Sequence, residues 1–227
     1  EEVMNDARRQ AERFDPENLE RRLDLTAVTV LTIDPLDPVP TLGGANLHPW
    51  IEVAGREMGD GSHDQRAIEA REDVLSFTTT TLDRPLIVMG RVRVHLWIRP
   101  DTPDLDLAVR LTDVYPDGRS MLVIDGVQRA RMRCADDREC LLTAGEPAEL
   151  VVDLWSTAIV FNAGHRIRLD ISGTNAPRFE PNPNDGTDLN QPTAHIVARP
   201  ELLFGAETRS RLELPVVAEP RLARGRT

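Results

Sequence analysis

Lysine is absent from this 227-residue chain, and all 27 of its basic residues are arginine. Without a primary ammonium group, the chain supports neither Schiff-base chemistry nor a phosphate-binding loop that depends on lysine. Its hydrophobic runs are short, and none approaches the roughly 18 residues of a membrane-spanning helix, so we expect no membrane partner. The 38 acidic residues give a net charge of −11. A surface of this sign repels phosphate backbones, so we also expect no nucleic acid partner.

Aromatic residues make up only 4% of the chain, so its core must consist mainly of valine, leucine and isoleucine. Cysteine is scarcer still, and two residues, Cys134 and Cys140, are too few for a disulfide-stapled mini-protein or a four-cysteine zinc site. Residues 1–13 lack the apolar segment of a signal peptide. We therefore expect a cytoplasmic chain with two free thiols, and a disulfide across the charged loop 135–139 is the sterically allowed alternative.

The hydrophobic pattern predicts an all-β fold. Residues 1–30 are charge-dense with apolar residues at helical spacing, which indicates a short helical N-terminal lead-in. From about residue 26 the period becomes two, and the clearest strand covers residues 92–98. Its inward positions are Val92, Val94, Leu96 and Ile98. Further strands are predicted at 105–111, 122–127, 150–154, 167–171 and 212–216, with turn sequences such as Pro116-Asp117-Gly118 between them.

Short strands, frequent turns and no long helix after residue 30 favour an antiparallel jelly-roll β-sandwich over residues 31–217. Residues 218–227 form a tail. Within the sandwich, the proline-rich stretch 31–63 is predicted to be a long irregular loop. Loops of this length in compact domains are usually functional or disordered.

The catalytic centre of a serine hydrolase has no counterpart in the sequence. The G-x-S-x-G turn that exposes the nucleophile of an α/β-hydrolase does not occur. Ser62, His63 and Asp64 are consecutive, so their side chains point in different directions, and a polar turn is a better interpretation than a triad. We assign no catalytic residue and expect the chain alone to be inactive.

Metal-ligand patterns are missing too. The five histidines form no paired motif, and residues 182–188, although rich in Asn, Asp and Gly, lack the closing glutamate of a calcium loop. A turn is the better interpretation there, and we expect neither metal nor cofactor. His95 should lie on the outer face of its strand. His165, which follows a turn glycine, should make a structural hydrogen bond.

Trp97 shares the outward face of strand 92–98 with His95. In a chain with so few aromatic residues, an outward tryptophan indicates that something covers this face. A loop of the same domain and a separate partner are both open alternatives.

Several motifs occur in an order that is similar to a known family. They are DPLDPVPTLGG at 34–44, DQR at 64–66, LTDVYPDGR at 111–119, DGVQRAR at 125–131, VFNAGHRI at 160–167, NAPRFEPNPN at 175–184 and LPVV at 214–217. Over about residues 31–217 the series resembles the C-terminal, non-catalytic domain of the X-Pro dipeptidyl-peptidase and cocaine esterase (CocE/NonD) family of serine hydrolases. That group also includes α-amino acid ester hydrolases and glutaryl-cephalosporin acylases.

The resemblance implies a galactose-binding-domain-like jelly roll that packs against an α/β-hydrolase domain. It also implies that the catalytic serine, aspartate and histidine come from that preceding domain. In the family, the loop after the glycine pair carries apolar residues to the mouth of the acyl pocket. The matching positions here are Leu47 and His48, followed by Trp50, which makes these three the predicted rim of the substrate pocket. Alternatively, Trp50 only pins the loop to its own domain.

We therefore expect an accessory domain of a serine hydrolase whose substrate is a small acyl ester, an amide or an X-Pro peptide. The first alternative is a carbohydrate-binding module, for which Trp50 and Trp97 are the candidate stacking platforms. The second is an assembly domain that forms a homo-oligomer through the face that carries Trp97.

Overall fold

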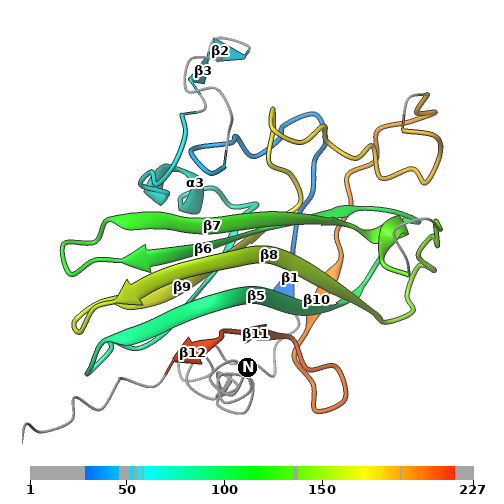
Figure 1. The fold of residues 1–227 in the computed structure, drawn as a ribbon. Coiled ribbons are helices and arrows are strands. Elements are labelled where there is room, and N and C mark those ends of the chain that lie inside the picture. Colours follow the sequence, from blue (N-terminus) through cyan, green and yellow to red (C-terminus); the bar gives the residue numbers. More distant parts are fainter. Residues whose placement is uncertain are drawn as a thin grey trace, which may run out of the picture.

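The computed structural model describes residues 29–45, 52–53, 56–57, 59–134, 138–189 and 191–217. These residues form two antiparallel β-sheets that share one core, with long loops across the outside of one sheet (Figure 1). The predicted all-β jelly-roll sandwich is thereby confirmed. Residues 1–28 of the predicted lead-in and the predicted tail, 218–227, lie outside the described residues.

The first sheet is organised around one long strand, β5 (Leu86–Arg99). One edge of β5 pairs with β8 (Ala148–Phe161). The other edge pairs in succession with three short strands, and the last of these also pairs with β1 (Thr29–Val30). The short strands are β12 (Val216–Val217), β11 (Arg211–Glu213) and β10 (Glu201–Leu203). Segments far apart in the sequence therefore meet on β5.

The second sheet has four strands, in the order β4 (Leu75–Thr78), β9 (Arg166–Ser172), β6 (Asp106–Val114) and β7 (Ser120–Arg129). A separate hairpin, β2 (Glu52–Val53) and β3 (Arg56–Glu57), stands apart from both sheets (Figure 1). Helix in the described ranges is limited to α3 (Arg66–Glu69) and the 3-10 turn η1 (Ala130–Met132). None of these described helices could cross a membrane.

The core lies between the sheets and is built from alternate residues of each strand. Val92, Val94, Leu96 and Ile98 are at most 2% exposed, as the period of two predicted. Alternate residues of β6 and β9 complete the same cluster from the other sheet. Each buried side chain of this size contributes roughly 1.5–3 kcal/mol relative to its exposed state, so an aliphatic core suffices where aromatic residues are few.

The outer face of the second sheet is buried as well, which simple alternation did not predict. Every residue of β6 is buried, including Asp106 and Arg110. Two loop segments cover this face, and backbone contacts fasten them: the Val39 amide donates to Thr174 Oγ1 at 2.7 Å, and the Gln65 amide donates to the Ser120 carbonyl at 2.7 Å. We call the buried polar side chains beneath these loops, which include Arg110, Asp125, Asp170 and Asn175, the polar layer.

The expectation of two free thiols is wrong, because Cys134 and Cys140 form a disulfide with their Cα atoms 6.2 Å apart. The Cys140 amide donates to the Arg131 carbonyl at 2.7 Å. This hydrogen bond folds the chain back directly after η1, which brings the two cysteines within bonding distance.

Candidate functional site

The predicted rim residues Leu47, His48 and Trp50 lie outside the described residues, so their role stays a prediction. The structure does describe where their loop leaves and rejoins the domain. Gly44 and Gly61 exchange two backbone hydrogen bonds, with N···O distances of 2.8 and 2.9 Å. We call this pair the neck. It closes the base of an excursion that contains the hairpin β2–β3 (Figure 1).

Steric contacts explain why glycine precedes the neck. Gly43 has a φ of +74°, and a Cβ atom there would lie 2.5 Å from the Gly61 carbonyl oxygen. Gln65, which is fully buried, holds both sides together: its side-chain amide donates to the carbonyls of Leu42 and His63 at 2.9 and 3.1 Å. The glycine pair therefore allows two backbones to approach, and the neck is anchored in the polar layer.

Ser62, His63 and Asp64 lie just after the neck, and their side chains do not form a triad. His63 Nε2 contacts the Asp60 carbonyl oxygen at 3.1 Å. The Asp64 carboxylate accepts hydrogen bonds from the Arg66 guanidinium at 2.6–3.1 Å. Ser62 is exposed. The three side chains therefore serve a turn and the start of α3.

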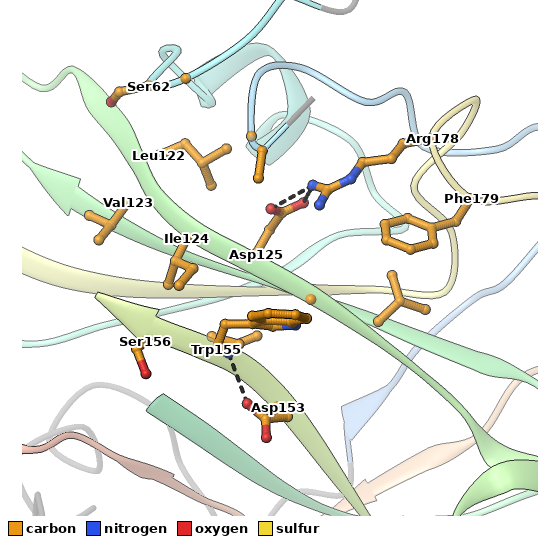
Figure 2. Close-up of a pocket in the computed structure, with 16 residues that line it drawn as sticks. Ser62, Leu122, Val123, Ile124, Asp125, Asp153, Trp155, Ser156, Arg178 and Phe179 are labelled. Carbon is orange, nitrogen blue, oxygen red and sulfur yellow. Dashed lines mark hydrogen bonds and ion pairs between the residues drawn. The ribbon is translucent and has the colours of Figure 1, made fainter. Parts of the chain in front are cut away.

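Beside the neck, a cavity of about 780 Å³ opens where the edges of β7 and β8 meet (Figure 2). A β-bulge in each strand borders it. In β7, Val123 is the extra residue, and in β8, Leu154 and Trp155 together oppose one residue of β5. Bulges re-aim side chains and are frequent beside functional sites. Leu122 and Phe179 supply further apolar wall.

Trp155 is the residue that the bulge in β8 turns outward. Its φ is +68° and 75% of its surface is exposed. Its amide donates to Asp153 Oδ1 at 2.8 Å, which holds this backbone conformation. A left-handed conformation in a bulky residue costs about 1–3 kcal/mol and persists only where the surroundings impose it.

The polar end of the cavity is an ion pair between Asp125 and Arg178. Arg178 Nη1 lies 2.8 Å from both Asp125 carboxylate oxygens, and Asn175 Nδ2 donates to Asp125 Oδ2 at 3.1 Å. The Arg178 guanidinium also lies 5.1 Å from the centre of the Phe179 ring. A Cβ atom at Gly44 would lie 2.8 Å from Arg178 Nη1, so the neck and the ion pair are in close contact.

A second polar group lies deeper, around Asp170 on β9. Ser76 Oγ donates to Asp170 Oδ1 at 2.5 Å. Burial raises the pKa of Asp170 to about 7, and the Glu69 carboxylate adds to this effect. The hydrogen bond from Ser76 and the charges of Arg168 and Arg110 oppose it. Glu69 itself pairs with Arg168. The Asp170 carboxyl group is therefore protonated over much of the acidic pH range.

The asparagine-rich stretch 182–188 forms a turn that is closed by its own aspartate. The Asp185 carboxylate accepts hydrogen bonds from the amides of Thr187, Thr193 and Ala194 at 3.0, 2.8 and 3.0 Å. Within the described ranges, no three His, Cys, Asp or Glu side chains are grouped so as to hold a metal ion.

His95 and His165 lie where the sequence predicted. His95 is on the outer face of β5, where its Nδ1 lies 2.9 Å from Glu149 Oε1. His165 is buried, with Nδ1 2.9 Å from Asp113 Oδ1. Trp97 faces outward but is only partly exposed, and its amide donates to Ser210 Oγ at 2.9 Å.

Sequence reasoning missed Trp155, although the strand pattern contains a signal for it. In β8 the buried positions are Leu150, Val152 and Leu154, and then the phase changes so that Phe161 is buried. When the buried positions of one strand change from even to odd residue numbers, one extra residue has been inserted between them, which is a bulge.

The fold and the site together define a class of protein. It is a β-sandwich domain with a long loop closed by the neck and a cavity beside it, and its described residues form no catalytic triad. A model of the family described as the X-Pro dipeptidyl-peptidase C-terminal non-catalytic domain matches residues 6–213, and the chain belongs to that family. It is a C-terminal domain of the CocE/NonD type of serine hydrolase.

Similar proteins include cocaine esterase from Rhodococcus sp. strain MB1 Bresler, which is 36% identical over 187 residues, or 81% of this chain. An aminopeptidase from a marine sediment Thaumarchaeota archaeon superposes with a TM-score of 0.75 and 25% identity over 85% of this chain. An α-amino acid ester hydrolase gives a TM-score of 0.75 and 27% identity over 84% of this chain. This chain spans about a third of each relative: 31% of cocaine esterase, 33% of the aminopeptidase and 32% of the ester hydrolase.

Proposed function

We propose that this chain is an accessory domain of a serine hydrolase. It buttresses an α/β-hydrolase domain, and its excursion between residues 46 and 58 forms part of the rim of the substrate pocket. The neck at Gly44 and Gly61 is the observation that carries the proposal. It gives the predicted rim residues Leu47, His48 and Trp50 a rigid base on the buried polar layer, and a rigid base is what a loop needs to position side chains against a neighbouring domain.

In this proposal the partner domain performs acyl transfer through an acyl-serine intermediate, and this chain contributes no reacting group. The rim shapes the acyl pocket and excludes water from it. Leu47 and Trp50 supply apolar surface, and His48 adds a polar imidazole. The relatives are named as ester hydrolases and an aminopeptidase, so small acyl esters, amides and X-Pro peptides are all candidate substrates.

The proposal is tested in a hybrid in which this chain replaces the matching third of cocaine esterase. We expect the hybrid to hydrolyse p-nitrophenyl butyrate or Gly-Pro-p-nitroanilide, and the isolated chain to hydrolyse neither. Leu47→Ala and Trp50→Ala should raise KM about tenfold with little change in kcat, because lost apolar contact weakens substrate and transition state alike.

The matched control is Leu141→Ala, which truncates a 46% exposed leucine beside the disulfide. It should leave KM unchanged. Turnover by the isolated chain that a serine-directed inhibitor abolishes would contradict the proposal. So would a hybrid whose KM is the same with every rim variant.

A further inference from the structure

The cavity between β7 and β8 lies where both sheets interrupt their regular pairing. Part of the cavity wall is tightly packed: Gly126 and Asp153 both line the cavity, and a Cβ atom at Gly126 would lie 2.6 Å from the Asp153 carbonyl oxygen. The bulges at Val123 in β7 and at Trp155 in β8 also border the cavity. The seam between β7 and β8 thus contains a close contact and, beside it, an opening lined by apolar side chains.

The backbone conformation of Trp155 costs free energy, and the side chain is not buried in return. Its positive φ costs about 1–3 kcal/mol, and 75% of the residue remains exposed. A buried aromatic side chain removes about 150–250 Å² from water, so covering this indole offers a large favourable term. In the view of Figure 2 the Trp155 ring lies below the Asp125–Arg178 pair, and Trp155 and Phe179 both line the cavity.

Further exposed apolar side chains lie on β8 and on its partner strand β5. Val160 of β8 is 45% exposed and Met89 of β5 is 60% exposed. Met89 is paired with Ala158, which lies between Trp155 and Val160 on β8. Exposed apolar side chains therefore also occur on this sheet beyond the cavity.

The charged groups at the cavity are already neutralised. Asp125 is bound to Arg178, and Asp153 is bound to Arg91 with a 2.6 Å contact. An occupant with a net charge would have to compete with these pairs. An apolar side chain would not, so the cavity suits an apolar segment of a protein partner.

We propose that Trp155 and this cavity are the docking site for an apolar segment of the α/β-hydrolase domain. The inference rests on the proposed function, which supplies that partner. Two observations favour it over other occupants. The relatives' chains are about three times as long as this one, so a partner domain accompanies this fold in each of them. The cavity is also bordered by Gly44 and Gly61, so whatever fills it lies at the base of the excursion that forms the predicted pocket rim.

Hydroxyl-radical footprinting followed by mass spectrometry tests the docking site in the isolated chain and in the hybrid with cocaine esterase. In the isolated chain, Trp155 should be oxidised rapidly. In the hybrid its oxidation should fall about fivefold, because the core of an interface is fully desolvated. Leu141 is the internal reference, since it is 46% exposed beside the disulfide, away from the cavity. Its oxidation should be equal in both.

Trp155→Asp provides a second measurement. In the isolated chain the substitution removes an exposed side chain, so the melting temperature should change little. In the hybrid the carboxylate would be buried, so the melting temperature should fall by several degrees. Leu141→Asp should affect neither protein.

Equal oxidation of Trp155 in both proteins overturns the inference, whether or not the hybrid is active. Protection in the isolated chain that grows with its concentration also overturns it, because a second copy would then be the occupant. Protection in the hybrid, together with rim variants that leave KM unchanged, supports the docking site and contradicts the proposed rim.

Discussion

Asp170→Asn should flatten the pH dependence of the stability of this domain. The carboxyl group is fully buried on β9 and has a pKa raised from 3.8 to about 7, first by burial and then by the neighbouring Glu69. Asn has nearly the shape of the protonated carboxyl group. Its amide oxygen can still accept the hydrogen bond from Ser76 Oγ, which is 2.5 Å long in the structure.

The sign follows from comparing the folded and unfolded states. The folded state binds this proton more tightly, so the stabilisation associated with it is complete below the unfolded pKa of 3.8. It is lost as the pH rises through the folded pKa of about 7. Each pKa unit corresponds to about 1.4 kcal/mol, so a rise from 3.8 to about 7 sets an upper limit of about 4 kcal/mol, and we expect a total loss of about 2–4 kcal/mol.

Urea denaturation at intervals between pH 4 and pH 8 measures this loss directly. The free energy of unfolding of the wild type, minus that of Asp170→Asn, should decrease by about 2–4 kcal/mol across the range. Glu207→Gln, at an exposed loop position, is the matched control and should show a constant difference. A constant difference for Asp170→Asn as well would refute the argument that this carboxyl group is buried as a neutral acid.

Three further predictions follow from single features of the fold. Replacing both Cys134 and Cys140 by serine should lower the free energy of unfolding by about 2 kcal/mol, the value for a short closed loop, and thiol titration of the unfolded, unreduced wild type should detect no free thiol. Gly126→Ala should destabilise the domain by about 1–3 kcal/mol in urea denaturation, because its Cβ atom would lie 2.6 Å from the Asp153 carbonyl oxygen; an unchanged midpoint would show that the seam is loose. Trp155→Gly should be more stable than Trp155→Ala by about 1 kcal/mol in thermal melts, because both remove the indole but only glycine tolerates the φ of +68°; equal stability would mean that this backbone is not strained.

The strands that face one core were predictable because alternation reports directly on burial. Residues 92–98 lie within β5 with the predicted faces, and the later strands overlap β6, β7, β8, β9 and β11. The buried outer face of β6 was not predictable in this way. Asp106 and Arg110 are polar, and polar residues at alternate positions normally indicate solvent. Here both are buried: Asp106 is bound by Arg129 of β7 and by Asn182 from a loop, and Arg110 donates to Ser172 at the end of β9.

The site was predicted only in part, for two different reasons. The resemblance places the predicted rim in the excursion after Gly43 and Gly44, and that rim stays a prediction because its residues lie outside the described ranges. The cavity depends on how β7 and β8 meet along their edges, and these two strands belong to different sheets and are not paired with each other. No local pattern encodes that meeting. The disulfide was misjudged for a similar reason, since the spacing of Cys134 and Cys140 allows a bond but only the fold-back after η1 enforces it.

The long strand β5 imposes an order on the completion of the fold. Its β8 edge can be filled once residue 161 has been synthesised, whereas its other edge waits for segments that begin at residue 201. Until then, the nascent chain presents a row of unpaired backbone donors and acceptors beside an apolar core. Exposed edges of this kind recruit strands from other molecules. A chain truncated before residue 201 should therefore be prone to aggregate during translation, even though most of its core residues have already been made.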